Sequence, residues 1–406
     1  MKSKITHCFL IAILTVGAAE AQRLELVTRY SLPDGAFGIT VENNLAYIAN
    51  DLEGIEIIDI SDPYGPFTVG SLDTPGFARS IAVRGGYAFI ADGDSGLAIA
   101  DVSVPSSPSL IGRYDNSGTA LTVVAAESEY VYIANGYSGM LVVDVSDPSN
   151  PSLQGAYPSS AYLMGLEVIG NYALVTANFV EPDFGELQII DVSDPSNPSF
   201  LTSLYIPGGA YGIHVAGGYA YVCAFDYGLR IFDVSYPPEP SNAGYFNTRG
   251  SARHTFVDSN YAFVADGTSG VSAVDVTDPF VPAFADSIDT RGIASDIYAA
   301  ADFIYVADDF SLTILHFSRT ACNYAAGDIN GNGFANGIDV TYGVSYFKGG
   351  EPPPTVCIDC PDSGRSLYGA GDVNGGCAFN GIDITYFIAY LKGSAPELLF
   401  CPNCPP

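Results

Sequence analysis

Short apolar runs rich in β-branched and aromatic residues recur along residues 24–317, and Gly, Pro and Asp separate them. One kind of run carries aromatic residues at alternate positions, as in Tyr130–Ile133, Tyr219–Val222 and Tyr261–Val264. Another kind begins near a Gly and continues into an acidic turn, as in Gly228–Asp233. Short alternating runs with such boundaries are typical of β-strands and not of helices. The pattern therefore predicts an all-β fold over this part of the chain.

The runs fall into groups, and a short phrase, Asp-Val-Ser-Asp-Pro or a close variant, ends the third run of every group except the last. Its first Asp returns at intervals of 42, 43, 47, 42 and 42 residues. The six aspartates are Asp59, Asp101, Asp144, Asp191, Asp233 and Asp275. Four strands in a repeat of this length predict one blade of a β-propeller. Asp and Ser side chains bond to nearby backbone N–H groups and Asp-Pro favours a turn, so we interpret the phrase as a structural turn.

The groups of strands predict a seven-bladed β-propeller within residues 22–318, with an incomplete last blade. Blade seven has His316 where the phrase places Asp, and no fourth run follows it. A spare run, residues 24–30, precedes the first blade and matches the fourth-strand pattern. We expect this N-terminal strand to complete blade seven, because closing the ring removes an open sheet edge. The longest interval predicts an inserted loop around Phe179–Phe184 in blade four.

The strands, the phrase and the number of blades resemble the LVIVD-repeat family of β-propellers over nearly the whole of residues 24–317. The resemblance implies the propeller fold. It implies no single biochemical activity.

Residues 319–326 form a connector, and the pattern changes after it to a loop of regularly spaced oxygen side chains. An EF-hand-type loop needs oxygen ligands at positions 1, 3, 5, 9 and 12, a carbonyl from position 7 and Gly at position 6. Asp328, Asn330, Asn332, Phe334 (through its backbone), Asn336 and Asp339 occupy these positions. The loop therefore predicts a Ca²⁺ site, and the apolar stretch 340–347 after it predicts a helix.

A second loop and apolar stretch follow 44 residues later. Its expected ligands are Asp372, Asn374, Ala378 (through its backbone), Asn380 and Asp383. Gly376 replaces the position-5 ligand and Cys377 replaces the bend glycine, so we expect weaker Ca²⁺ binding there. The two units resemble the dockerin domain, which implies a small α-helical domain with two calcium loops at residues 327–406. The resemblance also implies docking to a cohesin-type or cell-surface partner, often in polysaccharide-degrading assemblies.

Six cysteines gather in this C-terminal part and its tail: Cys322, Cys357, Cys360, Cys377, Cys401 and Cys404. Disulfides are the default in an exported chain, and six cysteines allow 15 connectivities. The two Cys-x-x-Cys pairs also fit a Cys₄ zinc site, so both interpretations stay open.

Residues 1–21 have the features of a secretory signal peptide. Lys2 and Lys4 precede an apolar core, and Ala19-Glu20-Ala21 supplies a cleavage site. We therefore expect a secreted protein in the extracellular space or at the cell surface, with the periplasm as the alternative. No later stretch is long and apolar enough to predict membrane insertion. The formal charge of −30 disfavours nucleic acid and anionic membranes as partners, because both bind basic surfaces.

Candidate binding residues lie before the first strands of several blades. Equivalent segments place Arg79 and Arg253 at the same position near the channel mouth, and Phe37, Tyr211 and Met164 correspond to them in other blades. Guanidinium groups and aromatic platforms suit an acidic or glycan-like ligand. Arg249 and Arg291, slightly earlier in their loops, complete the candidate set. The competing interpretation pairs these arginines with acidic residues near the second strands: Asp92, Asp266, Asp308 and Asp309.

Catalytic motifs are absent from the sequence: it has no Gly-x-Ser-x-Gly elbow, phosphate loop or nucleophilic Cys context. His214 and His254, on first strands, are interpreted as structural, and Cys223 as a buried free thiol. The main hypothesis is a secreted non-enzymatic binding or scaffold protein, with the propeller face taking a protein or glycan ligand. The alternative is a carbohydrate-active enzyme, a glycoside hydrolase or lyase, at the propeller mouth. Two carboxylates at hydrolase separation in the channel would favour the enzyme.

Overall fold

The structure, a computed structural model, describes residues 23–318 except 116–117, 120, 126–128 and 181–183. The expected signal peptide, the connector and the dockerin-like domain lie outside the described residues. So do all the proposed calcium ligands and the six C-terminal cysteines. No helix among the described residues is long and apolar enough to cross a membrane.

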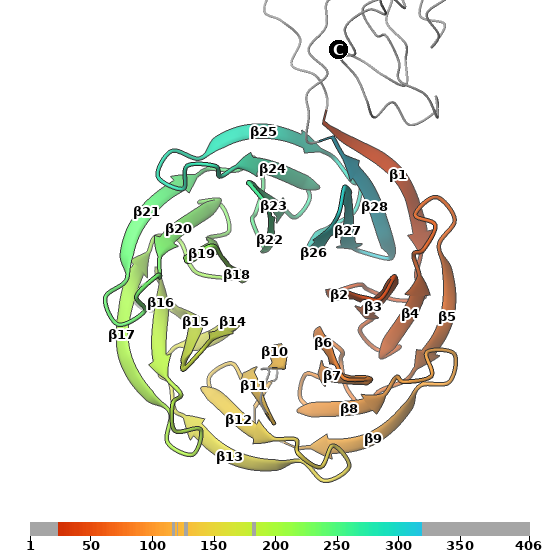
Figure 1. Cartoon of the computed structure of the whole chain (residues 1–406), viewed down its shortest axis with the longest axis horizontal. Coiled ribbons are helices and arrows are strands. Elements are labelled where there is room, and N and C mark those ends of the chain that lie inside the picture. The colour runs from red at the N-terminus through yellow and green to blue at the C-terminus, as the bar shows by residue number, and fades with distance from the viewer. Residues whose placement is uncertain (1–22, 116–117, 120, 126–128, 181–183, 319–406) are drawn as a thin grey trace, which may run out of the picture. The chain divides into compact units, whose positions relative to one another are not determined.

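Seven four-stranded antiparallel sheets are arranged as blades around a central channel (Figure 1). The first four blades comprise β2 (Gly38–Glu42), β3 (Leu45–Ala49), β4 (Ile55–Asp59), β5 (Phe67–Leu72); β6 (Ser80–Arg84), β7 (Tyr87–Ala91), β8 (Leu97–Asp101), β9 (Ser109–Tyr114); β10 (Thr122–Ala125), β11 (Tyr130–Ala134), β12 (Met140–Asp144), β13 (Ser152–Tyr157); and β14 (Tyr162–Ile169), β15 (Tyr172–Phe179), β16 (Phe184–Asp191), β17 (Ser199–Ile206). The last three comprise β18 (Ile213–Ala216), β19 (Tyr219–Cys223), β20 (Leu229–Asp233), β21 (Ser241–Phe246); β22 (His254–Asp258), β23 (Tyr261–Ala265), β24 (Val271–Asp275), β25 (Ala283–Ile288); and β26 (Ala294–Ala300), β27 (Phe303–Asp308), β28 (Ser311–Phe317) with β1 (Leu24–Ser31). The predicted seven-bladed all-β propeller is confirmed.

The ring is closed by strands from the two ends of the propeller. β1 pairs antiparallel with β28, from Leu24 opposite Phe317 to Ser31 opposite Ser311. Figure 1 shows β1 as the outermost strand of the sheet that contains β26, β27 and β28. The Asp286 carboxylate also accepts hydrogen bonds from the backbone N–H groups of Arg23 and Leu24, at 2.6 and 2.7 Å. The start of β1 is thereby tied to blade six as well as to blade seven.

The repeated phrase forms the same turn in each copy. Oδ1 of Asp59 accepts hydrogen bonds from the backbone N–H and the hydroxyl of Ser61, at 2.8 and 2.6 Å. The N–H two residues later donates to the first Asp in the other copies as well: Asp101, Asp144, Asp191, Asp233 and Asp275. The hydrogen bonds from Ser61 lower the pKa of Asp59. The interpretation of the phrase as a structural turn is confirmed.

Blade four is longer than its neighbours because its extra residues extend the sheet. Its four strands have eight residues each, whereas those of blade two have five or six. β15 and β16 stay paired as far as Phe179 and Phe184, whose rings stack 4.8 Å apart. The sequence predicts an inserted loop that begins at Phe179. Within the described residues, most of the insertion is strand instead, since this aromatic pair continues the ladder.

The hydrophobic core lies between adjacent blades. One of its clusters contains Ile55 and Ile57 from blade one together with Ile81 and Ile90 from blade two, all buried. This is face-to-face sheet packing, repeated around the ring. Cys223 is fully buried among such residues and is a free thiol, as predicted. Burial raises the pKa of this thiol well above its ordinary value, so it stays protonated and unreactive.

Candidate functional site: the channel mouth

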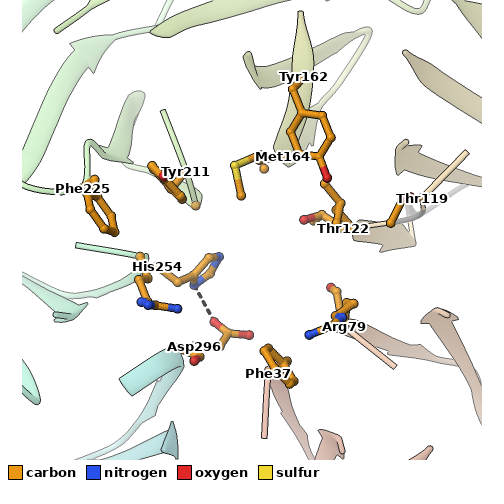
Figure 2. Close-up of a pocket in the computed structure, with 16 residues that line it drawn as sticks. Phe37, Arg79, Thr119, Thr122, Tyr162, Met164, Tyr211, Phe225, His254 and Asp296 are labelled. Carbon is orange, nitrogen blue, oxygen red and sulfur yellow. Dashed lines mark ion pairs between the residues drawn. The ribbon is translucent and has the colours of Figure 1, made fainter. Parts of the chain in front are cut away.

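A cavity of about 570 Å³ opens where the innermost strands begin. Figure 2 shows its labelled lining residues arranged around the central opening. They come from several blades, because most of them lie at or just before the start of an innermost strand, at the edge of the channel. A cavity of this size is within the range of small-ligand sites.

The cavity brings together five residues that the sequence places at equivalent positions: Phe37, Arg79, Met164, Tyr211 and Arg253. They come from five different blades. The five equivalent positions therefore meet in the lining of one cavity. Tyr162, Phe225, His254 and Asp296 also line the cavity, and sequence reasoning did not assign them to it.

Two predicted arginines do not line the cavity. The guanidinium of Arg249 lies 5.3 Å from the ring centroid of Phe284, which belongs to the outermost strand β25. Arg291 occupies a left-handed turn (φ 63°), and its N–H donates to Asp289. Each of these loops runs from the outer rim towards the channel. A residue only a few positions earlier in the loop therefore stays further from the channel.

Arg79 is held by neighbours on several sides. Its guanidinium lies 4.2 Å from the ring centroid of Phe37 and 5.7 Å from that of Phe77. One of its nitrogens is 3.5 Å from Oδ1 of Asp51. The cation–π contact and the ion pair orient this guanidinium beside the cavity and neutralise much of its charge.

Arg253 differs from Arg79 because its guanidinium is unpaired. No carboxylate of the described residues lies within 4 Å of it, and its Nε is buried without a hydrogen-bond partner. Next to it in the lining, the rings of Tyr211 and Phe225 stack 5.1 Å apart. A buried donor without a partner is costly unless a ligand or water satisfies it. The cavity therefore combines an unsatisfied cation with an aromatic platform.

The competing interpretation, in which the arginines pair with acidic residues near the second strands, is wrong for the described residues. Asp92 instead accepts hydrogen bonds from the Thr74 hydroxyl (2.6 Å) and the Gly76 N–H (2.9 Å). Asp266 and Asp308 bind the equivalent threonines, Thr248 and Thr290. None of these three, nor Asp309, forms an ion pair with an arginine in the described part of the chain.

The three buried aspartates therefore have a structural task. Each follows or ends a second strand and holds the loop that leads into its own blade, so its acceptor sites are filled. Burial raises the pKa of Asp92 and of Asp308, and the threonine hydrogen bonds only partly offset this effect. The loops that carry the arginines are fixed in this way without using the arginine charges.

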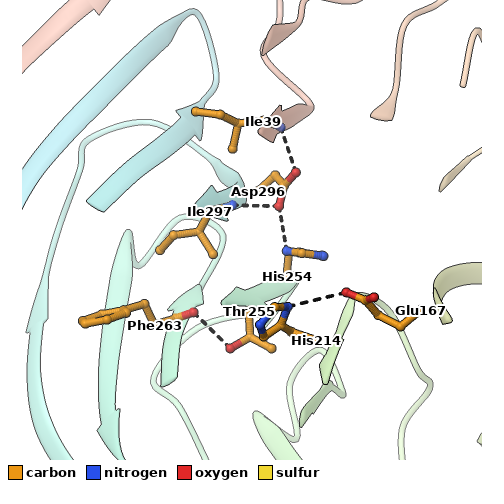
Figure 3. Close-up of polar contacts among 8 residues, drawn as sticks. All are labelled: Ile39, Glu167, His214, His254, Thr255, Phe263, Asp296 and Ile297. Atoms are coloured by element: carbon orange, nitrogen blue, oxygen red, sulfur yellow. Dashed lines mark hydrogen bonds and ion pairs between the residues drawn. The ribbon is translucent and has the colours of Figure 1, made fainter. Parts of the chain in front are cut away.

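A histidine–carboxylate pair lines the same cavity as the arginines. Nδ1 of His254 is 2.6 Å from Oδ1 of Asp296. Asp296 is itself fixed by the backbone N–H groups of Ile39 (2.9 Å) and Ile297 (2.8 Å), as Figure 3 shows. Burial acts to lower the pKa of His254. The charge and hydrogen bond of Asp296, with a smaller effect from Glu167, outweigh burial and raise that pKa above 6.5.

A second pair stands beside the first. Nδ1 of His214 is 3.5 Å from Oε1 of Glu167, and its ring stacks on Phe256 at 4.4 Å. Glu167, His214, His254 and Asp296 come from β14, β18, β22 and β26, the innermost strands of four consecutive blades. The sequence analysis interprets both histidines as structural, and each of them has a carboxylate partner in the structure. The sequence analysis did not assign Glu167 and Asp296 to the channel, although both lie on the innermost strands of their blades.

Comparison with known proteins identifies the repeats. The model of the LVIVD repeat matches residues 35–74, 75–116, 118–159, 162–205, 207–248, 249–290 and 291–318, which is more than half of the chain. The chain belongs to the LVIVD repeat family. Each match runs from an innermost strand outwards, and the seventh, shorter match lacks the fourth strand that β1 supplies in this LVIVD propeller.

Solved structures share the fold of this LVIVD protein at low sequence identity. A computationally designed protein, Ika8, aligns with a TM-score of 0.53 and 8% identity, covering 74% of this chain and 99% of its own. A chain of a Mitotic Checkpoint Complex aligns with a TM-score of 0.58 and 10% identity, covering 78% of this chain and 99% of its own. At these identities the likeness concerns the fold alone. No curated protein matches the chain.

Proposed function

We propose that this protein is a secreted, non-enzymatic binding protein whose channel mouth captures a ligand with an anionic group, such as an acidic glycan. The observation that carries the proposal is the unpaired guanidinium of Arg253 in a cavity lined by aromatic rings. A guanidinium fork binds a carboxylate through two parallel hydrogen bonds. Tyr211 and Phe225 offer flat apolar faces for the rest of the ligand.

The arrangement of carboxylates favours binding over hydrolysis. Most glycoside hydrolases use two carboxylates on opposite sides of the scissile bond. Among the described residues that line the cavity, Asp296 is the one carboxylate. Its oxygens already engage His254 and the backbone N–H groups of Ile39 and Ile297. A side chain held in this way supports the channel wall better than it would serve as an acid or a nucleophile.

Calorimetric titration with a matched pair of sugars tests the proposal. We expect the protein to bind trigalacturonic acid and to bind its trimethyl ester at least about tenfold more weakly, because the ester lacks the charge that Arg253 recognises. The two sugars share ring size and linkage, so the comparison isolates the carboxylates. Equal affinity for the two, or binding of neither, would refute an acid-specific glycan site.

We further propose that residues 327–406 anchor the propeller to a cohesin-type or cell-surface partner in a Ca²⁺-dependent manner. The proposal is supported by the two loops that begin at Asp328 and Asp372 and by their resemblance to dockerin loops.

Chelation with EGTA is expected to reduce the helical circular dichroism of the protein and to leave the thermal transition of the propeller unchanged. The physical reason is that Ca²⁺ binding and folding of such loops are coupled. Asp328→Ala should reproduce most of the loss and Asp372→Ala much less, because the second loop departs from the ligand pattern. A dichroism signal that chelation does not change would overturn the calcium assignment.

A further inference from the structure

His254 is placed to touch whatever occupies the cavity. Asp296 takes its Nδ1, so the second ring nitrogen, Nε2, lies on the opposite side of the imidazole, and Figure 2 shows this ring among the lining residues. Its side chain is 31% exposed to the channel. Gly212 of the neighbouring blade allows this position, because a Cβ there would collide with the imidazole ring.

Protonation of His254 adds one positive charge to the lining of the cavity. Arg79 is offset by Asp51, and the charge of Arg253 is offset in sum by that of Asp296. The imidazolium form of His254 therefore makes the cavity one charge more positive than the neutral form does. An anionic group entering the cavity is attracted more strongly when His254 is protonated than when the imidazole is neutral.

Other titratable groups near His254 do not supply this positive charge. Glu167 on β14 adds a negative charge, and it is paired with His214 on β18. Cys223 on β19 remains a neutral thiol, because burial and the charges of Asp266 and Asp296 raise its pKa. The negative charges of Asp296 and Glu167 therefore favour the protonated form of His254. Neither carboxylate competes with His254 as a hydrogen-bond donor to an anion.

We propose that His254, oriented by Asp296, is a direct cationic contact for the anionic group of the ligand, so that protonation of this histidine and ligand binding reinforce each other. The inference rests on the proposed ligand site and names its regulation. Carboxylate, phosphate and sulfate groups share the required chemistry. Affinity is then highest at acidic pH and declines as pH rises through the pKa of His254, whose charge is lost in that range.

The test is titration of the full-length protein with trigalacturonic acid at a series of pH values. We expect about tenfold tighter binding at about pH 5.5 than at about pH 8, since a charge-assisted hydrogen bond is gained. His254→Gln should bind with an affinity that no longer changes over this range. His214→Gln, the matched control, should keep the pH dependence, because His214 does not line the cavity.

Nuclear magnetic resonance of the wild-type histidine ring protons provides a readout that does not depend on a variant folding. Saturating trigalacturonic acid should raise the proton affinity of His254 by the same factor by which protonation tightens binding, because linkage is reciprocal, so the midpoint of the His254 titration shifts upwards by the logarithm of that factor. Binding that is strong and independent of pH, with an unmoved His254 midpoint, would overturn this inference and leave the ligand site standing. Absence of binding at every pH would overturn both.

Discussion

Removal of residues 22–32 is expected to open the ring of blades and to lower the free energy of unfolding by roughly 5–10 kcal/mol. Seven residue pairs between β1 and β28 disappear, and so does the fully buried Leu24 side chain. The two hydrogen bonds that Asp286 accepts from the start of the chain are lost as well. The expected loss is comparable to the whole stability of a typical domain, so thermal melting should show a greatly lowered transition or none.

Two controls separate ring closure from a general loss of sequence. Leu26→Ala should change stability by less than about 1 kcal/mol, because Leu26 is 43% exposed on the same strand. Adding a synthetic peptide of residues 22–32 to the truncated protein should raise the transition again, since the peptide can pair with the free edge of β28. A truncated protein that melts like the intact one would show that β1 does not hold the ring together.

Replacement of Arg253 by Ala is expected to weaken binding of trigalacturonic acid about 100-fold, because a desolvated charge pair is removed from the site. The fold should be unaffected, since the side chain forms no ion pair or hydrogen bond with other described residues. Arg253→Lys keeps the charge and loses the two-pronged geometry, so an intermediate affinity is expected. The measurement is calorimetric titration with the melting temperature as a check on folding.

Arg249→Ala is the matched control for this substitution. It removes the same side chain four residues earlier, where the guanidinium contacts Phe284 and not the cavity. Binding should stay within about twofold of the wild type, as for a surface residue outside the interface. If Arg249→Ala weakened binding as much as Arg253→Ala did, the loss could not be assigned to the cavity.

The fold was largely predictable from the sequence because the same pattern of strands and turns recurs from blade to blade. The Asp-Val-Ser phrase recurs in six of the seven blades, and each copy forms the same local backbone hydrogen bond, as between Asp59 and Ser61. The missing fourth strand of blade seven and the spare N-terminal run are visible in the same periodicity. Strand and turn patterns at a nearly regular spacing are enough to predict such an architecture.

The site was predictable only in part, because a shift of a few residues along a loop decides whether a side chain reaches the cavity. Equivalent positions placed Arg79 and Arg253 correctly at the mouth, but Arg249 has the same loop context and lies at the outer strand. The pairing of buried aspartates with threonines was missed, because local sequence does not show which neighbour fills a buried carboxylate. The approach of His254 to Asp296 joins two blades and has no signature in either repeat.

The central claim is that a ligand carboxylate binds the guanidinium of Arg253 in the channel mouth. A double-mutant cycle measures this most directly: wild type and Arg253→Ala are each titrated with trigalacturonic acid and with its methyl ester. We predict that at about pH 8, where His254 is neutral, the wild type prefers the acid and Arg253→Ala binds acid and ester equally weakly. An unchanged preference for the acid in Arg253→Ala would contradict the account.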